Sequence, residues 1–389
     1  MQLAPAGLGD TLSRQAEGIG EKVAGVAADQ VDRDARFPAE AIEALRAESL
    51  LSVLVPSDLG GLGATVGQVA DMVFELSRHC ASTAMIFAMH QIQVASIVHH
   101  GRSAFFGNYL SELAERQLLL ASATTELGVG GDVRSSVCTV ERDEHGVIHL
   151  EKMAPVISYG EYADGILATA RREPASPPND QVLVLCRPPG LTLEPISGWD
   201  TLGFRGTCSL GYRLVAQGGP ELILDDAYDE ISSRTMLPVS HILWSSVWLG
   251  LAASAVAKAR GFVRTEARRK PGVTPPSALR LAELVAELQR MEELVRGAAR
   301  YYDETCHDID GLERMGFAIA MNSLKVSSST LVVDIVNRAM TICGMAGYRE
   351  DSPYSLGRTL RDAHGAAVMV NNDRINTSTA QMLLVYKDE

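Results

Sequence analysis

The spacing of apolar residues changes twice along this chain of 389 residues, and the two changes limit the folds that it can adopt. The first third is helical in pattern: AEAIEALRAESL at 39–50 has apolar residues at helical spacing, and AMIFAMHQIQVASIVHH at 84–100 is apolar almost all round, as a buried helix is. Between them, VPSDLGGLGAT at 55–65 carries one proline and three glycines, which break the helical pattern. These segments predict a helical domain over residues 1–120.

The rest of the chain has a β pattern followed by a second helical pattern. From about residue 120, short β-rich runs such as VIHLEKM, GILATAR and QVLVLCR alternate with turn residues. After Pro238 the helical pattern returns in three long stretches, which contain WSSVWLG, ALRLAEL and GFAIAMN. The chain is therefore predicted to be an α+β protein, with a middle β domain over 121–235 and a C-terminal helical-bundle domain over 236–389.

Composition and charge narrow the classes of partner. The net charge is -13 and the pI is near 5.2, so the average surface repels nucleic acid and anionic membranes. The segment MQLAPAGLGDTLSRQAEG lacks an export-signal pattern, and no later window is an uninterrupted apolar span, so we expect a cytoplasmic protein without a membrane partner. The six cysteines are dispersed, and the adjacent His99 and His100 diverge on a helix, so no metal site is expected.

Three motifs in the β region resemble those of one family. TTELGVGGD at 124–132 resembles the T-E-P-x-x-G-S-D signature of the acyl-CoA dehydrogenase superfamily. KMAPVISYGEYADGILATAR at 152–171 is similar to that family's K-x-W-I-T-N-G-x-x-A-D-x-x-x-V-x-A-R strand pair, with Val156 in place of the tryptophan. WDTLGFRGTCSLGYRL at 199–214 is similar to its L-G-x-R-G-T-x-S stretch. Small residues in such turns let the backbone approach a planar ring.

Two further motifs lie in the C-terminal region. ARRKPG at 267–272 resembles R-x-x-F-G, where the family's arginine reaches a flavin pyrophosphate, although Pro271 replaces the phenylalanine and Leu279 stands where a glutamine is usual. CGMAGYREDSPYSLGRTLRDA at 343–363 resembles the glycine turn and the R-D-A segment that end the family's pattern. The combination of five motifs, spread over about residues 25–385, is far more specific than any one of them.

The resemblance implies an FAD-dependent oxidoreductase with an N-terminal helical domain, a central β-barrel-like domain and a C-terminal four-helix bundle. It implies cofactor contacts from a set of polar and small residues: Thr124, Thr125, Ile157, Ser158, Arg268, Gly344, Met345, Gly347 and Asn372. The implied substrate contacts are Gly131 and Ser240. Because the arginine and the glycine turn of the family reach a neighbouring subunit's cofactor, the resemblance also implies a homodimer or homotetramer.

The family's catalytic base is missing at both of its usual positions. Aligned without gaps, Val370 and Ser240 stand where the glutamate is found, and neither side chain takes a proton. Asp373 is the only carboxylate in VMVNNDRINTST at 368–379, so it is the candidate base. A cap of the helix that follows is the alternative role for Asp373, and sequence reasoning favours it.

Three functions remain open on this evidence. The first is an acyl thioester dehydrogenase with a relocated base, acting on an acyl group carried by CoA or by an acyl carrier protein and passing electrons to a flavoprotein. The second is a flavin monooxygenase or oxidase of the same fold, supplied by a flavin reductase, in which His90 acts as an acid or base near neutral pH. A satisfied core histidine is the alternative for His90. The third is a catalytically silent binding subunit.

Overall fold

The computed structural model describes residues 7–129 and 134–387. The first part is helical, as its pattern predicts, with α4 starting in a capping box in which Thr65 and Gln68 exchange hydrogen bonds. In α5 only Met89, Val98 and His99 fall outside the buried set, which agrees with a helix that is apolar all round. The helices are α1 (Leu8–Ile19), α2 (Gly25–Asp34), α3 (Ala39–Ala47), α4 (Val66–Ser77), α5 (Ala81–His100) and α6 (Ala104–Arg116).

The middle part is built from two sheets. One has the order β1-β4-β5 and the other β2-β3-β7-β6; β1 and β4 are parallel, and the other pairs are antiparallel. Strand β5 is buried along its whole length, whereas β6 is mostly exposed, as an edge strand is. The strands are β1 (Leu120–Ala123), β2 (Glu141–Arg142), β3 (Ile148–Ala154), β4 (Gly165–Arg171), β5 (Gln181–Cys186), β6 (Leu191–Ser197) and β7 (Gly211–Gly218).

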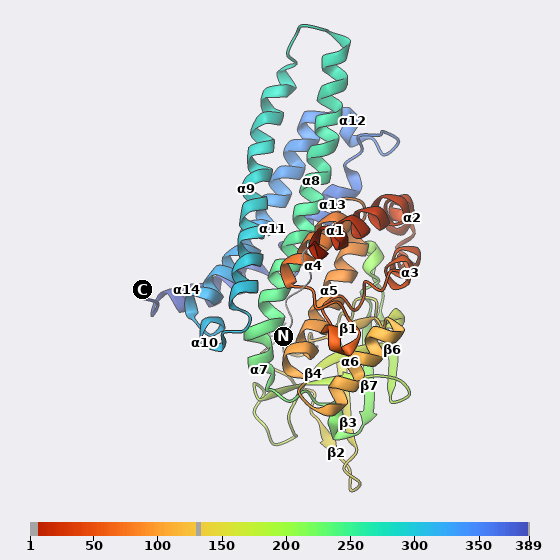
Figure 1. Cartoon of the computed structure of the whole chain (residues 1–389), viewed down its shortest axis with the longest axis vertical. Helices are drawn as coiled ribbons and strands as arrows, with labels where there is room; N and C mark the ends of the chain where they lie inside the picture. The colour runs from red at the N-terminus through yellow and green to blue at the C-terminus, as the bar shows by residue number, and fades with distance from the viewer. Residues whose placement is uncertain (1–6, 130–133, 388–389) are drawn as a thin grey trace.

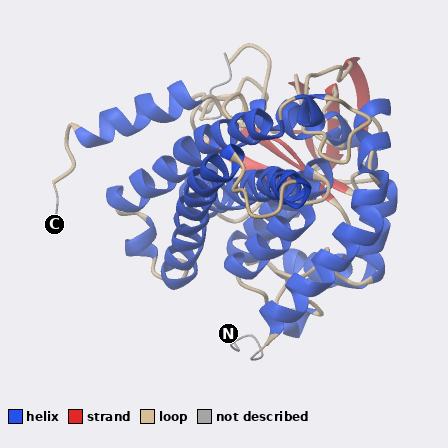
Figure 2. Ribbon diagram, turned by 90° about the horizontal axis from the view of Figure 1, so that it is seen from above, coloured by secondary structure: helices blue, strands red, loops and turns tan. Residues whose placement is uncertain are grey.

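The C-terminal part is dominated by three long helices, which run side by side in Figure 1. Helix α8 packs against α9 and α11 of its own domain and against α4 and α5 of the N-terminal domain, so its first half lies in the core. Helix α14 extends away from the bundle towards the C-terminus (Figure 2). The helices are α7 (Tyr228–Ile231), α8 (Leu237–Arg269), α9 (Pro276–Thr305), α10 (Ile309–Leu312), α11 (Met315–Cys343), α12 (Met345–Tyr348), α13 (Gly357–His364) and α14 (Asn372–Leu383).

Three helical stretches are long and apolar enough, by length and composition, to cross a membrane. They are Ala81–His100, Tyr228–Arg269 and Met315–Cys343, and their apolar windows are 89%, 83% and 50% buried inside the fold. The sequence reading missed these windows because polar residues interrupt each of them. Their burial shows that the apolar surface of the first two packs mainly within the protein.

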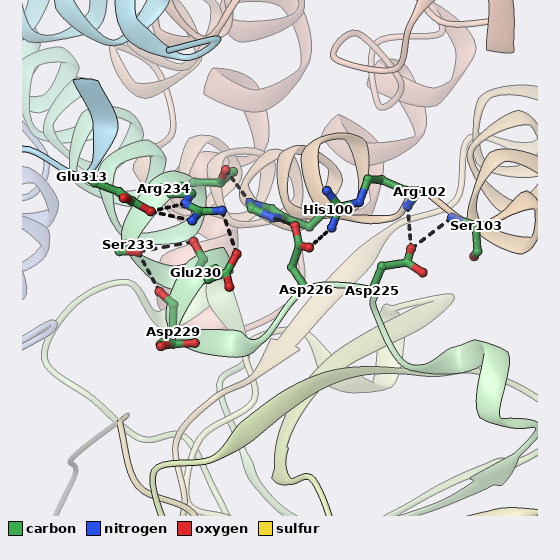
Figure 3. A network of polar contacts seen from close by, with 11 residues as sticks. His100, Arg102, Ser103, Asp225, Asp226, Asp229, Glu230, Ser233, Arg234 and Glu313 are labelled. Carbon is green, nitrogen blue, oxygen red and sulfur yellow. Dashed lines mark hydrogen bonds and ion pairs between the residues drawn. The ribbon is translucent and has the colours of Figure 1, made fainter. Parts of the chain in front are cut away.

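A polar network joins the end of α5 to the start of the C-terminal domain (Figure 3). His100 is buried between two partners: its Nδ1 lies 2.8 Å from a carboxylate oxygen of Asp226, and its Nε2 lies 2.9 Å from the hydroxyl of Thr235. Asp225 accepts the backbone N–H groups of Arg102 and Ser103. The N-terminal domain, the chain leaving the β domain and the turn before α8 are therefore fixed to one another, through the buried His100 and through the exposed contacts of Asp225.

A second joint links the β domain to α13. The backbone N–H of Phe204 donates to Asp362 at 2.6 Å, and a side chain at Gly203 would meet the carbonyl oxygen of Arg361 at 2.4 Å, so this approach requires glycine. Burial raises the pKa of Asp362 to about 6. Arg361 pairs with Asp32 of α2, whose backbone carbonyl accepts a hydrogen bond from Arg205. Two of the sequence motifs thus meet here and hold three domains together.

Asp362→Ala is expected to lower the free energy of unfolding by about 1–3 kcal/mol, because it leaves the buried N–H of Phe204 without an acceptor. Urea denaturation followed by circular dichroism measures this change. Asp351→Ala is the matched control, because the Asp351 side chain is exposed and pairs only locally, with Arg349 two residues earlier in the chain. An equal loss in both variants would show that the joint adds nothing to stability.

Candidate functional site

The turn that opens the β domain is tied to the end of strand β3. The hydroxyl of Thr125 donates to the carbonyl of Val156 at 3.1 Å, and the backbone N–H of Leu127 donates to the carbonyl of Met153 at 2.9 Å. Thr124 and Thr125 are half-buried, as are Val156 and Ser158 across the turn. The first two sequence motifs therefore form one edge, along which small and polar side chains remain accessible.

A buried ion pair between Lys152 and Glu126 lies beneath the accessible side chains of this edge and holds the two motifs together. Lys152 Nζ lies 3.1 Å from Glu126 Oε2, with side chains 0% and 4% exposed, and it also donates to the backbone carbonyl and the hydroxyl of Thr169. Glu126 accepts further hydrogen bonds from Ser136 and from the backbone N–H of Cys138. Burial raises the pKa of Glu126, but Lys152 and these donors outweigh burial and hold the pKa below its usual value.

A chain of hydroxyl groups leads from the Phe204 joint to this edge. The Thr207 hydroxyl donates to the carbonyl of Phe204, and Ser209 lies 2.8 Å from both Thr207 and Ser158. Each hydroxyl has one proton, so Ser209 donates to Thr207 and Ser158 donates to Ser209. The lone pairs of Ser158 are then left to accept a hydrogen bond at the half-buried edge. Thr125 has also donated its proton, and it offers an acceptor in the same way.

These residues fit one edge of a flavin ring, whose N–H group needs an acceptor. Ser158 and Thr125 supply acceptors, and Val156 is smaller than the tryptophan that stands at this place in the family. The side chain of Ile157 is fully buried and its N–H donates to the carbonyl of Leu210, so Ile157 supports the edge and its side chain does not line it. The hydroxyl proton of Thr125 is used within the chain, so Thr125 can accept a hydrogen bond from a flavin but cannot donate one.

The start of α8, the middle of α11 and the start of α14 form a second polar group of residues. Lys325 Nζ donates to the carbonyl of Val370 at 2.6 Å and to Asn372 Oδ1 at 2.7 Å, and it lies 5.7 Å from the centre of the Trp248 ring. His241 is bonded to the carbonyl of Met321, and burial lowers its pKa to about 4, so it is neutral. The predicted residue Asn372 belongs to this group, and the predicted Asp373 follows it in α14.

Ser240 and Asp373 differ in their exposure. Ser240 is buried, and its hydroxyl donates to the carbonyl of Met236 in the preceding turn of the helix. Asp373 is exposed on the first turn of α14, where its backbone N–H donates to the side chain of Asn371. The cap of α14 is therefore Asn371, and the capping role predicted as the alternative for Asp373 belongs to the residue two positions earlier.

The predicted pyrophosphate contacts lie at the far end of the bundle. Arg268 is exposed in the last turn of α8, about 40 Å along the helix from Ser240 at 1.5 Å per residue. Met345 is 70% exposed, Gly344 has a φ of 55°, and a side chain at Gly347 would meet Cys343 at 2.8 Å. Within one chain these residues do not meet the edge around Ser158. That they serve a neighbouring subunit's cofactor stays a prediction.

His90 lies in the core of the N-terminal domain. Its Nε2 is 2.7 Å from the carbonyl of Leu51, and its Nδ1 accepts the backbone N–H of Leu120 at 3.0 Å. Burial lowers the pKa of His90 to about 4. Both ring nitrogens are occupied, so the catalytic role predicted for His90 finds no open nitrogen, and the core alternative describes its position.

Gly131, a predicted substrate contact, lies outside the described residues.

A cavity of about 270 Å³ lies elsewhere, between α4, α8 and α9, with Thr65, Asp71 and Arg296 among its lining residues. It is smaller than the usual range for cofactor sites, and it contains none of the motif residues. The cofactor site that the sequence predicts at the Thr125–Ser158 edge stays a prediction, which the hydrogen-bonding chemistry of that edge supports. Sequence reasoning missed the buried charges at Glu126, Lys152 and Lys325, although Lys325, a lone charge in a long uncharged stretch of helix, is a readable signal.

Glu126→Gln is expected to lower the free energy of unfolding by about 3–5 kcal/mol, because it leaves the Lys152 ammonium buried without a counter-charge. The double variant Glu126→Met/Lys152→Met should recover much of this loss, which a double-mutant cycle in urea measures. Glu151→Gln is the control: Glu151 lies beside Lys152 on β3, but its side chain is exposed and pairs with Arg213, so stability should be unchanged. Additive losses in the cycle would contradict the coupling.

Comparison with known proteins places these features in a family. A model of the acyl-CoA dehydrogenase N-terminal domain matches residues 11–117, and a model of the acyl-CoA dehydrogenase C-terminal domain matches residues 232–377. The chain is 26% identical to the probable FMNH2-dependent monooxygenase SfnC of Pseudomonas putida, over 86% of each chain. It is 24% identical to cyclohex-1-ene-1-carbonyl-CoA dehydrogenase of Syntrophus aciditrophicus (strain SB), over 92% of this chain and 85% of the relative.

A solved structure confirms the fold. The FMN-bound TdsC of Paenibacillus sp. A11-2 superposes with a TM-score of 0.84 and 18% identity, covering 97% of this chain and 98% of the other. The order of helical, β and helical parts is the order that the two matched domain models imply, and the relatives with these domains are enzymes. The chain belongs to the acyl-CoA dehydrogenase family, whose members are flavin-dependent enzymes.

Proposed function

We propose that the protein is an FAD-dependent oxidoreductase that removes hydrogen across the α and β carbons of an acyl thioester carried by CoA or by an acyl carrier protein, with Asp373 as the base. The observation that supports this reaction is the fixed start of α14. Lys325 and Ser329 of α11 hold Asn372 by hydrogen bonds, so the backbone that carries the next residue, Asp373, has a defined place. Ser158 and Thr125 would hold the edge of the flavin ring.

A bound flavin supplies the hydride acceptor for this reaction. Asp373 takes the α proton, the electron pair of that C–H bond becomes the new carbon–carbon double bond, and hydride leaves the β carbon. The neutral His241 and the ammonium of Lys325 put no negative charge beside the developing enolate, which therefore is not repelled from this side. The acyl chain needs a dry environment, because water competes for the base.

Asp373 is exposed in a single chain, so the proposal includes a second copy that covers it. Exposed apolar residues surround the start and the end of α14: Val368 (77%), Val370 (43%), Leu384 (85%) and Val385 (67%). Apolar surface of this kind marks contact surfaces in soluble proteins. A homodimer or homotetramer would bury it, and it would also bring Arg268 and the glycine turn of one chain to the cofactor of another.

A flavin monooxygenase is the second candidate, and the uncharged Val370 and Ser240 favour it. In this reaction reduced flavin, supplied by a separate reductase, reacts with oxygen, and no carboxylate base is needed. Several relatives bear names of this class, among them SfnC and the dibenzothiophene monooxygenase of Mycolicibacterium goodii. The two candidates differ in the reductant, which is the thioester itself in the first and an external donor in the second.

Anaerobic addition of a panel of acyl-CoA thioesters to the flavin-loaded protein tests the first candidate. We expect the visible flavin band to bleach, and Asp373→Asn to slow bleaching by at least about 10²-fold, because the base is lost. Asp334→Asn, an exposed carboxylate on α11, is the control and should bleach at the wild-type rate.

Two other outcomes decide against this reaction. If the wild-type flavin stays oxidised with every thioester, but oxygen is consumed once a flavin reductase and its donor are added, the monooxygenase candidate replaces it. If Asp373→Asn bleaches as fast as the wild type, the reaction stands but the base is another group. Extraction and identification of the bound flavin decide between FAD and FMN.

A further inference from the structure

Lys325 is a buried cation whose hydrogen-bond partners are neutral oxygens. Its exposed fraction is 0%, and no carboxylate of the described residues lies within 4.0 Å of its Nζ. Its three donors point to the carbonyl of Val370, the side chain of Asn372 and the face of the Trp248 ring. A buried ammonium without a counter-charge costs free energy, so its retention calls for a role other than stability.

The partners of Lys325 lie on the joining segment, residues 365–371, which connects α13 to α14, and on the first residue of α14. Val370 has a φ of 49°, a left-handed conformation that β-branched residues rarely adopt. Its carbonyl is turned towards α11, where Lys325 receives it. The backbone is thus held in a strained conformation by an identifiable contact.

Further contacts seat α14 on α11, and nearly all of them are polar. Asn372 exchanges hydrogen bonds with Ser329, and Asn322 donates to the hydroxyl of Thr379 at 3.1 Å. Ile375 is the one residue of α14 in the buried set. With so little apolar burial, the place of α14 depends on these polar contacts and on the two hydrogen bonds that Lys325 donates.

We propose that Lys325 is a positioning residue: by holding the carbonyl of Val370 and the side chain of Asn372, it sets the conformation of the joining segment and hence the position of Asp373. The part of this inference that concerns catalysis rests on the proposed function, because it takes Asp373 as the base. The part that concerns the joining segment does not. Lys325 acts through Asp373 and need not touch the substrate.

Closure of the joining segment over Lys325 depends on pH. Burial lowers the pKa of Lys325 to about 8 when the segment is closed, and opening to water returns it towards its ordinary value of 10.5. Protonation therefore favours the open segment, and closure strengthens as pH rises from about 8 towards 10.5. His241 on α8, which feels the charge of Lys325, is already neutral, and Asp373 and Arg374 are the ionisable residues that follow Asn372 in α14.

Hydrogen–deuterium exchange of the intact, flavin-loaded protein tests the segment directly. For Lys325→Met we expect exchange at residues 369–373 to rise about tenfold, without a fall in the midpoint of thermal unfolding, because the substitution also removes an uncompensated buried charge. Lys258→Met is the matched control: Lys258 also donates to a backbone carbonyl, that of Ser355, so its loss should leave 369–373 unchanged. Wild-type exchange at 369–373 in Lys325→Met would overturn the proposal.

The pH dependence and the chemistry give two further readouts. Opening of 369–373, corrected for intrinsic exchange, should fall between about pH 8 and 10.5 in the wild type, and should lose this dependence in Asn372→Asp, whose carboxylate gives Lys325 a counter-charge. Flavin bleaching by a thioester should slow by about 10²-fold in Lys325→Met with unchanged thioester affinity, and Lys325→Arg should restore part of the rate.

The exchange and bleaching results separate the two proposals. A wild-type protein that no thioester bleaches would end the dehydrogenase proposal, whereas the exchange data would still decide whether Lys325 holds the segment. Changed exchange in Lys325→Met with wild-type bleaching would remove the link from Lys325 to catalysis.

Discussion

The backbone of Phe204 is the point on which both halves of the candidate site depend. Its N–H donates to Asp362 of α13, and its carbonyl accepts the hydroxyl of Thr207. Through Thr207 and Ser209 this carbonyl orders the chain of hydroxyls that leaves Ser158 as an acceptor. Through Asp362 the N–H fixes α13, and the joining segment runs from α13 to Asp373. The positions of Ser158 and of Asp373 therefore both depend on the backbone of Phe204. This residue has a φ of 50°, a left-handed conformation that the surrounding contacts must hold.

Much of the fold could be predicted because it is encoded locally. The buried helix α5, the three long C-terminal helices and the short β runs all follow from the spacing of apolar residues, and that spacing is read over a few turns of chain. The glycine-containing motifs were also readable, and Gly203 now has a reason: the carbonyl of Arg361 approaches it from a segment about 160 residues later in the chain.

The side-chain roles were harder to predict, because they depend on partners that are distant in the sequence. The nitrogens of His90 are occupied by backbone groups of Leu51 and Leu120, and no local pattern announces that contact. Asn371 caps α14, and Asp373 two residues later does not, a difference too small for helix-start signals to resolve. The role of Lys325 requires the joining segment to lie against α11, which only the folded chain shows. Such departures from a purely apolar interior are expected at functional sites.

The structure of the protein with a bound flavin tests the central claim most directly. We predict that the polar edge of the flavin ring lies at hydrogen-bond distance from the Ser158 hydroxyl, beside Thr125 and Val156, with the start of α8 across the ring. We further predict that Arg268 and the glycine turn beside the flavin's diphosphate come from a second copy of the chain. A flavin bound away from the Thr125–Ser158 edge, or no flavin bound at all, would contradict the account.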